Sequence, residues 1–137
     1  MRYRVDIERD GSNYMVSFPD IPEALTCGDS REEALEMAHD ALIVAFDFYF
    51  EDERPVPMPT PIEDDDEWVD VPAGVAIKVL LLNAMLESGM SQAELARRMN
   101  TRPQEMQRIV NLNHATKIDT IEKALLALGK RLEVSIV

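Results

Sequence analysis

Four polar side chains suited to reading DNA bases recur at helical spacing in the second half of the chain: Gln104, Gln107, Arg108 and Asn111. Glutamine can bond both the N6 donor and the N7 acceptor of adenine, and arginine can bond O6 and N7 of guanine. Pro103 fits the first turn of a helix and disfavours helical geometry in the residue before it. The spacing therefore predicts a helix from Pro103 whose polar face can enter the major groove.

The residues ahead of this helix have the features of another short helix and a tight turn. Ser91 and Glu94 have the spacing of a capping box, in which each side chain bonds an amide of the first turn. Gln92 then stands where a helix N-terminus approaches phosphate, and Asn100 tolerates the left-handed backbone of a turn. Two short helices joined in this way form a helix-turn-helix motif. The residues predicted to contact DNA are Gln92, Arg102, Gln104, Gln107, Arg108, Asn111 and Lys117.

Two further helices are expected in this half of the chain, followed by a short strand. One helix runs from Pro72 to Gly89, and the other begins with Asp119 as its cap and ends at Gly129. Residues 132–137 alternate like a strand without an evident partner, which predicts that they pair with a second copy of the chain. The residues predicted to form this dimer contact are Leu132, Val134 and Ile136.

The charge of the chain divides it into two modules. The net charge is −12, yet residues 1–70 hold 5 Lys and Arg against 20 Asp and Glu, a balance of −15, whereas residues 71–137 hold 9 against 6, a balance of +3. Nucleic acids are bound mainly through Lys and Arg, so only the second module fits a polyanion. We therefore place a module boundary near Asp70 and expect different partners for the two halves.

The first module begins with the alternating pattern of strands. Residues 1–18 predict a β-hairpin, and a short third strand is expected around residues 24–27. Ser30 and Glu33 have the spacing of a capping box, which predicts that a helix follows. Its apolar stripe consists of Leu35, Ala38, Leu42, Ala45, Phe46 and Tyr49.

A proline-rich segment, residues 54–67, predicts an extended loop or linker because its prolines suit neither helices nor central strands. Residues 68–71 then predict a short strand that can return to the hairpin sheet. The expected fold class is α+β, in which a small antiparallel sheet with one helix precedes an all-α helix-turn-helix module that ends in a short strand.

No group of residues has the pattern of a catalytic, metal or cofactor site. Asp64–Asp66 lacks the glycine and the alternating ligands of a calcium loop, and His39 is interpreted as a surface or boundary residue. Cys27 is the only cysteine, so no intrachain disulfide can form. A metal-dependent nuclease based on Asp6 is a rival interpretation, but such chemistry needs several acids around two metal ions. We therefore expect a protein that is not an enzyme and has no cofactor.

The second module resembles the Xre/Cro/C1 family of helix-turn-helix repressors. The family pattern Ser-Gln-x-Glu-Leu-Ala is matched by Ser91, Gln92, Glu94, Leu95 and Ala96. This resemblance implies that Gln104, Gln107 and Arg108 occupy base-reading and phosphate-contacting positions. Two positions depart from the pattern, because Asn100 replaces the usual glycine of the turn and Leu112 replaces the glycine after the second helix.

The chain as a whole resembles HicB-type antitoxins. The stretches that carry the resemblance are Tyr14–Phe18, Asp20–Thr26, Ala45–Asp52, Lys78–Ala84 and His114–Asp119. The resemblance implies that the first module, a partial ribonuclease-H-like fold, binds and blocks a HicA-type toxin, a small basic ribonuclease that cleaves mRNA. It also implies that the second module binds the operator of its own operon. The charge division agrees independently, because an anionic module is attracted to a cationic, RNA-handling surface.

Another alternative is a stand-alone repressor whose first module senses a small molecule. A short basic reading frame beside this one favours the antitoxin, and its absence favours the sensor. Helix-turn-helix proteins bind half-sites about 34 Å apart, so we expect a homodimer, or a homotetramer if the first module adds a second contact. No signal core or membrane span is recognisable, which leads us to expect a cytoplasmic protein without a membrane partner.

Overall fold

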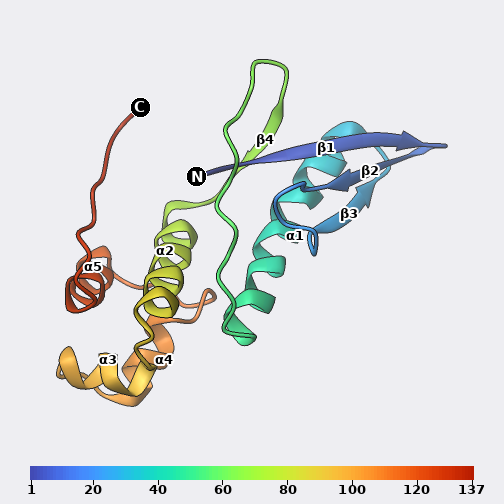
Figure 1. Cartoon of the computed structure of the whole chain (residues 1–137). Coiled ribbons are helices and arrows are strands. Elements are labelled where there is room, and N and C mark those ends of the chain that lie inside the picture. The colour runs from blue at the N-terminus through green and yellow to red at the C-terminus, as the bar shows by residue number, and fades with distance from the viewer.

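The first half of the chain forms a four-stranded antiparallel sheet. The computed structural model describes all 137 residues. The strands are β1 (Arg2–Asp10), β2 (Asn13–Ser17), β3 (Leu25–Gly28) and β4 (Glu67–Asp70), in the order β3-β2-β1-β4. β1 and β2 form the predicted hairpin, in which Gly11 takes the positive φ of 63° that the turn requires. β4 pairs with β1, which confirms that the chain returns to the hairpin sheet (Figure 1).

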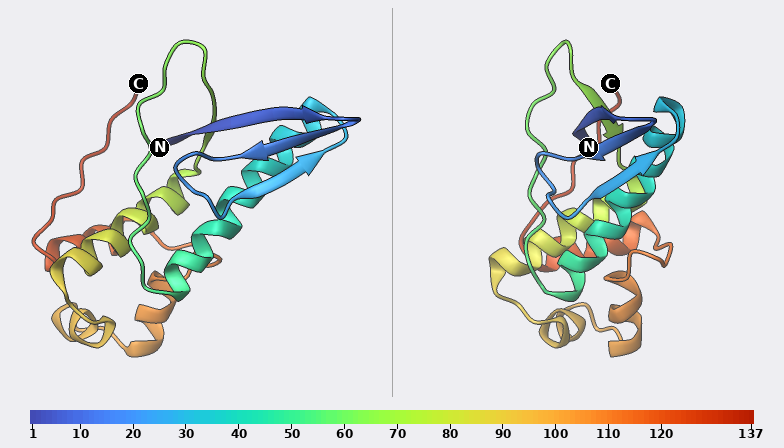
Figure 2. Two further views of the ribbon diagram at one scale, coloured as in Figure 1. Left: turned by 45° about the vertical axis from the view of Figure 1, so that its right-hand side comes forward. Right: turned by 90° about the vertical axis from the view of Figure 1, so that its right-hand side faces the viewer.

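Helix α1 (Arg31–Glu51) packs across one face of this sheet (Figures 1 and 2). The Glu33 N–H donates to Ser30 Oγ at 3.1 Å, so the predicted N-cap is confirmed. The side chains that α1 buries are Ala34, Ala38, Leu42, Ala45, Phe46 and Tyr49. This set matches the predicted stripe except at one position, because Leu35 is only half-buried and Ala34 is buried in its place. The Phe46 and Tyr3 rings pack at 5.6 Å between centroids and anchor the helix to β1.

The proline-rich segment between α1 and β4 has no regular structure, as predicted, but hydrogen bonds hold its first half to the rest of the fold. Val56 is 2% exposed, and the Asn83 side-chain amide bonds both its N–H and its C=O, at 2.8 and 2.9 Å. The Tyr3 hydroxyl donates to the Pro57 carbonyl at 2.7 Å. A buried peptide without strand neighbours needs such partners for its polar groups. The first half of the segment is therefore a fixed part of the fold rather than a free linker.

Four helices make up the second half of the chain. They are α2 (Ala73–Ser88), α3 (Gln92–Arg98), α4 (Pro103–Ile109) and α5 (Ile118–Ala127). Asn100 has a φ of 52°, the left-handed conformation predicted for the turn, and α4 begins at Pro103 as predicted. The prediction that Asp119 caps α5 was wrong, because the cap residue is Lys117. Asp119 lies instead in the first turn, where its negative charge interacts favourably with the positive end of the helix dipole.

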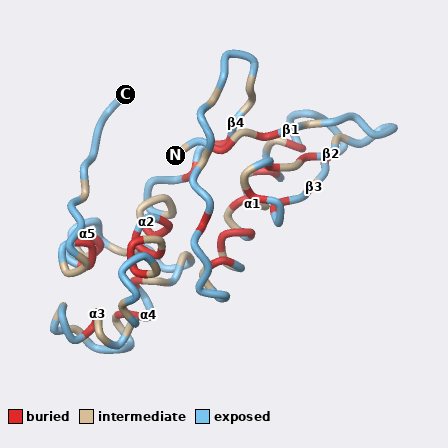
Figure 3. Tube along the Cα trace, viewed as in Figure 1, coloured by how far each residue is buried: buried red, intermediate tan, exposed pale blue.

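Helix α2 contributes to both hydrophobic cores, which Figure 3 shows as buried stretches along the chain. Val79 and Leu82 belong to the core beneath the sheet, whereas Leu81, Ala84 and Met85 belong to the core among α3, α4 and α5. The predicted module boundary lies just ahead of this shared helix. No single helix is long and apolar enough to cross a membrane, and α2 and α3 reach that criterion only together, across a bend of 101°.

The last residues of the chain extend away from α5 without regular structure (Figures 1 and 2). The strand predicted for residues 132–137 is therefore not formed within the chain, since no backbone hydrogen bond joins it to another segment. Leu132 is half-buried, whereas Val134 and Ile136 are 74% and 98% exposed. Pairing with a second copy stays a prediction, which the exposed apolar side chains favour.

Candidate nucleic-acid interface

Helix α4 separates its apolar and polar side chains onto opposite faces. Met106 and Ile109 are buried, whereas Gln104, Gln107 and Arg108 are exposed. At about 100° per residue, the three polar positions fall within one arc of the helix, opposite the two buried ones. The structure therefore brings these three predicted DNA-contacting residues together on one exposed face.

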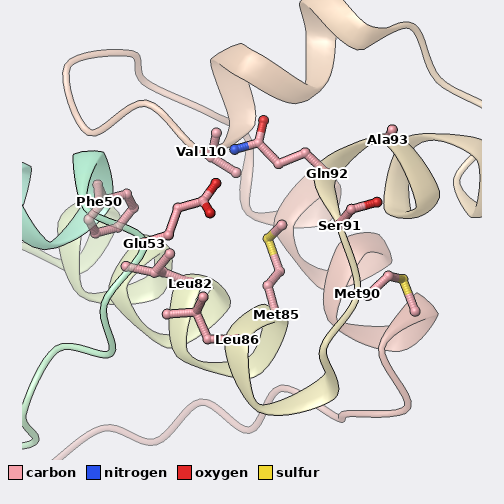
Figure 4. A pocket seen from close by; sticks show the side chains of 10 residues that line it. All are labelled: Phe50, Glu53, Leu82, Met85, Leu86, Met90, Ser91, Gln92, Ala93 and Val110. Atoms are coloured by element: carbon pink, nitrogen blue, oxygen red, sulfur yellow. The ribbon is translucent and has the colours of Figure 1, made fainter.

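The start of α3 is capped as predicted, but its first residue faces a cavity. The Glu94 N–H donates to Ser91 Oγ at 3.1 Å, while the Glu94 carboxylate pairs with Arg98 at 3.5 Å instead of completing the box. Gln92 is half-buried and lines a cavity of about 430 Å³ between α1, α2 and α3, with its amide beside Val110 (Figure 4). Gln92 is therefore not grouped with the exposed residues of α4, and a phosphate contact requires its side chain to turn outward.

The other predicted DNA contacts lie at the ends of α4 and at the start of α5. Arg102 and Lys117 are the exposed N-cap residues of α4 and α5. Asn111 is also exposed, but its Oδ1 accepts the N–H of Asn113 at 2.9 Å. That oxygen is thus used within the loop, as is usual for an asparagine turn, and the amide NH₂ and the second lone pair of the oxygen remain to bond a base.

A buried lysine that sequence reasoning missed supports the end of α4. Lys78 on α2 is 3% exposed, and its Nζ donates to the carbonyls of Arg108, Asn111 and His114 at 3.0, 2.6 and 2.5 Å. Burial lowers the pKa of this amine from its ordinary value. The Arg108 carbonyl is in the last turn of α4, where carbonyls lack partners within the helix, and the other two are in the loop that follows. Lys78 therefore ties the end of α4 to this loop, where Leu112 replaces a helix-ending glycine.

The sequence contained one signal of this role. Lys78 lies three residues after Val75 and four before Leu82, within the buried stripe of an otherwise apolar helix. A lysine is almost never fully buried unless its amine has partners. Its position therefore indicated a buried polar contact, although the sequence did not show which carbonyls would accept it.

Acidic residues of α1 lie beside the polar face of α4. Asp47 and Glu51, near the end of α1, line one hollow together with Gln107 and Asn111. Burial and, to a smaller extent, the neighbouring Glu51 raise the pKa of the Asp47 carboxyl from its ordinary value. The negative potential of α1 therefore extends to one side of the predicted DNA-contacting face.

One carboxylate of the acidic module, that of Glu23, is contacted by both a tyrosine and an arginine. The Tyr49 hydroxyl donates to Glu23 at 2.5 Å, and Arg54 lies 3.4 Å from the same carboxylate. The Tyr49 hydrogen bond is the main reason that the pKa of Glu23 is lowered, and burial, followed by this bond, raises the pKa of Tyr49 to about 12. Asp6 is exposed on the outer face of the sheet, and no group of three or more His, Cys, Asp or Glu residues is arranged to hold a metal ion.

Comparison with known protein families shows which family this chain resembles. The sequence model of HicB-like antitoxins of bacterial toxin–antitoxin systems matches residues 2–80, more than half of the chain. The match covers the whole sheet, α1 and the first half of α2. The chain therefore belongs to the HicB-like antitoxin family.

Curated relatives extend the similarity beyond α2. Antitoxin HicB 2 of Photorhabdus laumondii is 63% identical over 134 residues, which is 98% of this chain and 95% of the relative. Antitoxin HicB of Escherichia coli strain K12 is 53% identical over 138 residues, spanning the whole of both chains. Antitoxin HicB of Pseudomonas fluorescens is 38% identical over 135 residues, 98% of this chain and 92% of the relative.

Family membership gives the general function of the chain. It is an antitoxin of a bacterial toxin–antitoxin system rather than an enzyme. The nuclease interpretation based on Asp6 is therefore set aside.

Proposed function

We propose that this antitoxin acts through two surfaces on its two modules. The acidic first module binds and neutralises a basic, mRNA-cleaving toxin of the HicA type. The second module is a helix-turn-helix that binds the operator of its own operon and so represses it. Both activities belong to the cytoplasm, and the DNA-binding form is a homodimer or homotetramer.

The charge of the first module supports toxin binding. Residues 1–70 carry a balance of −15, which attracts a protein whose active surface is cationic because it handles RNA. Long-range attraction of this kind raises the association rate and selects against anionic partners. The family description, which names an antitoxin of a toxin–antitoxin system, agrees with such a partner.

The two faces of α4 are the observation that carries the operator proposal. Gln104, Gln107 and Arg108 share an exposed face opposite the buried Met106 and Ile109, which is the arrangement that major-groove reading requires. A short turn at Asn100 connects α3 to α4, which is the order of elements in a helix-turn-helix motif. The exposed cations Arg97, Arg102 and Lys117 have no ion-pair partner within the chain and are available to phosphates, whereas Arg98 is paired with Glu94.

The exposed C-terminal segment supports the dimer. An apolar, strand-like segment with unpaired backbone groups pairs readily with its own copy. Deleting residues 133–137 is therefore expected to give monomers in sedimentation at a concentration where the full chain is dimeric. Dimers that persist after the deletion place the contact elsewhere, with the first module as the next candidate.

One observation favours the stand-alone sensor as a second candidate function. The cavity beside Gln92 lies between the modules and combines apolar walls, such as Leu82 and Met85, with the Glu53 carboxylate (Figure 4). Its volume of about 430 Å³ is within the range of small-molecule sites. A repressor without a neighbouring toxin gene, whose thermal stability rises with one metabolite, would fit this candidate.

The two halves of the proposal can be tested together and fail separately. The chain is co-expressed with the product of the neighbouring short, basic reading frame, and growth, co-purification and gel shifts on the upstream DNA are measured. We expect restored growth, a stable complex and a shifted band. The double variant Gln104→Ala, Arg108→Ala should keep the first two results and lose the third. Failure of co-purification rejects toxin binding, whereas an absent shift with the unmodified chain rejects operator binding.

A further inference from the structure

Helix α1 has an exposed apolar stripe beside its buried face. Met37, Val44 and Phe48 are 43%, 55% and 48% exposed, and the half-buried Ala41 lies between them. Their spacing of four, three and four residues places all four on one side of a helix. This stripe is distinct from the residues that α1 buries against the sheet, so the fold of this chain leaves it uncovered.

Carboxylates run alongside the stripe. At about 100° per residue, the next arc of α1 holds Glu33, Glu36, Asp40, Asp47 and Glu51. The only Lys or Arg of the helix is Arg31, and it pairs with Glu67 of β4 rather than with this row. The row therefore has no cationic partner on its own helix, apart from the contact of Asp40 with the His39 ring.

The arrangement is unfavourable in the isolated chain. Glu36 and Asp40, and likewise Asp47 and Glu51, are like charges four residues apart, a spacing that destabilises a helix. The exposed apolar side chains beside them also lose the gain they would make on burial. Both costs are removed if a cationic protein with an apolar groove covers α1.

We propose that the α1 stripe and its acidic row form the docking surface for the toxin, so this inference rests on the proposed toxin binding. The partner is a cationic protein that holds Val44 and Phe48 in a shallow apolar groove, with Lys or Arg along the rim facing Glu36 and Asp47. This is the helix-in-groove mode of recognition, in which residues at helical spacing act as anchors.

Two other surfaces fit this partner less well. The outer face of the sheet mixes signs, since Arg2 stacks on Trp68 at 5.0 Å and Arg4 lies on the same face as Asp6. A cationic partner would meet cations there. A second copy of this chain is also disfavoured as the occupant of the stripe, because two α1 helices would bring their acidic rows together.

A matched pair of charge insertions tests the apolar part of the surface. Val44→Arg places a cation in the stripe, and Met15→Arg places one on the outer face of the sheet at a side chain of similar exposure, 45%. The probe is the neighbouring reading frame's product with its nuclease activity disabled, and affinity is measured by calorimetry. We expect Val44→Arg to weaken binding about 30-fold or more, the size of a central anchor, and Met15→Arg to change it little.

A second pair tests the acidic row by its effect on association rate. Glu36→Lys should slow association at low salt and lose most of this effect at about 0.5 M salt, where charges are screened. Asp65→Lys, the same charge change in the exposed loop, should have a smaller effect. Circular dichroism and thermal melting of each variant show that α1 remains folded.

The outcomes separate this inference from the proposed function. If the unmodified chain binds the probe and Val44→Arg binds equally well, the docking surface is wrong while toxin binding stands; loss with Met15→Arg alone moves the surface to the sheet. If the unmodified chain does not bind, both proposals fail. A smaller oligomer of Val44→Arg in sedimentation, with toxin binding intact, shows that the stripe is covered by a second copy and also overturns the inference.

Discussion

Helices α1 and α4 both present polar side chains to solvent, but different interactions stabilise the two helices. α1 has 21 residues, a side-chain cap at Ser30 and six side chains buried against the sheet. α4 has seven residues, no side-chain cap and two buried side chains, and the Arg108 carbonyl in its last turn accepts from Lys78 of another helix. Because a helix as short as α4 is not stable alone, its exposed residues are positioned by tertiary contacts. The long helix instead tolerates a row of repelling carboxylates.

The largest expected effect comes from removing the main anchor of α1. Phe46→Ala deletes a fully buried ring and should lower the free energy of unfolding by about 3–5 kcal/mol. Phe48→Ala, on the same helix but 48% exposed, should leave stability nearly unchanged and weaken toxin binding instead. Urea denaturation and toxin affinity of both variants check this prediction. Equal loss of stability would show that the exposed stripe is structural.

The next effect concerns the support of α4. Lys78→Met keeps the apolar stem but removes three hydrogen bonds from a buried charged amine and leaves the His114 carbonyl without a donor, while Arg108 and Asn111 keep backbone donors. We expect a loss of stability of about 3 kcal/mol. Operator binding should fall more than toxin binding, because the end of α4 loses its anchor. Gel shifts and calorimetry measure the two affinities. Lys78→Arg should retain part of the stability and part of the operator affinity. The control is Lys123→Met, which replaces an exposed lysine of α5.

A smaller effect is expected on the exposed face of α4. Gln104→Ala should relax base preference at one operator position by about 1–3 kcal/mol, because one bidentate contact is lost. Arg108→Ala should weaken binding without melting the helix, since its ion pair with Glu105 at 3.6 Å is exposed and contributes little. Gel shifts on a set of single-base operator variants distinguish the two. Unchanged binding for both variants would contradict the proposed orientation of α4.

The smallest effect should appear at the acidic end of α1. The raised pKa of Asp47 means that its ionised form is disfavoured in the folded state, so its contribution to stability is largest at low pH and is lost as the pH rises through the raised pKa. Asp47→Asn should therefore stabilise the chain at neutral pH, because it removes a partly buried charge and its repulsion by Glu51; the repulsion alone contributes about 0.3 kcal/mol, the size of one like-charge pair. The gain should vanish below the ordinary aspartate value of 3.8, as melting curves over a pH series can show.

Features that depend on neighbouring residues were predictable from sequence. Ser30 caps α1, Asn100 adopts the left-handed turn and Pro103 opens α4, because each effect acts within a few residues. The hairpin and the exposed face of α4 follow from simple periodicities in the same way. These local signals were sufficient for the α+β class and for the position of three candidate DNA contacts.

Features that depend on distant contacts were not predictable. Val56 is buried inside a proline-rich loop because Asn83, 27 residues later, bonds both of its peptide groups. Gln92 faces a cavity because the end of α1 lies across from α3. The C-terminal segment alternates like a strand but forms none, because a strand needs the edge of a neighbouring strand and none lies beside this segment within the chain.

The hollow that Asp47 and Glu51 share with Gln107 and Asn111 connects the two proposed binding events. If both proposals hold, the same carboxylates would attract a toxin on α1 and repel phosphates near α4, so a toxin that neutralised them would raise operator affinity. Thermodynamic linkage is reciprocal, and DNA must then tighten toxin binding by the same factor. Repression would thus follow the ratio of toxin to antitoxin, and the promoter would be most open when free antitoxin lacks its partner.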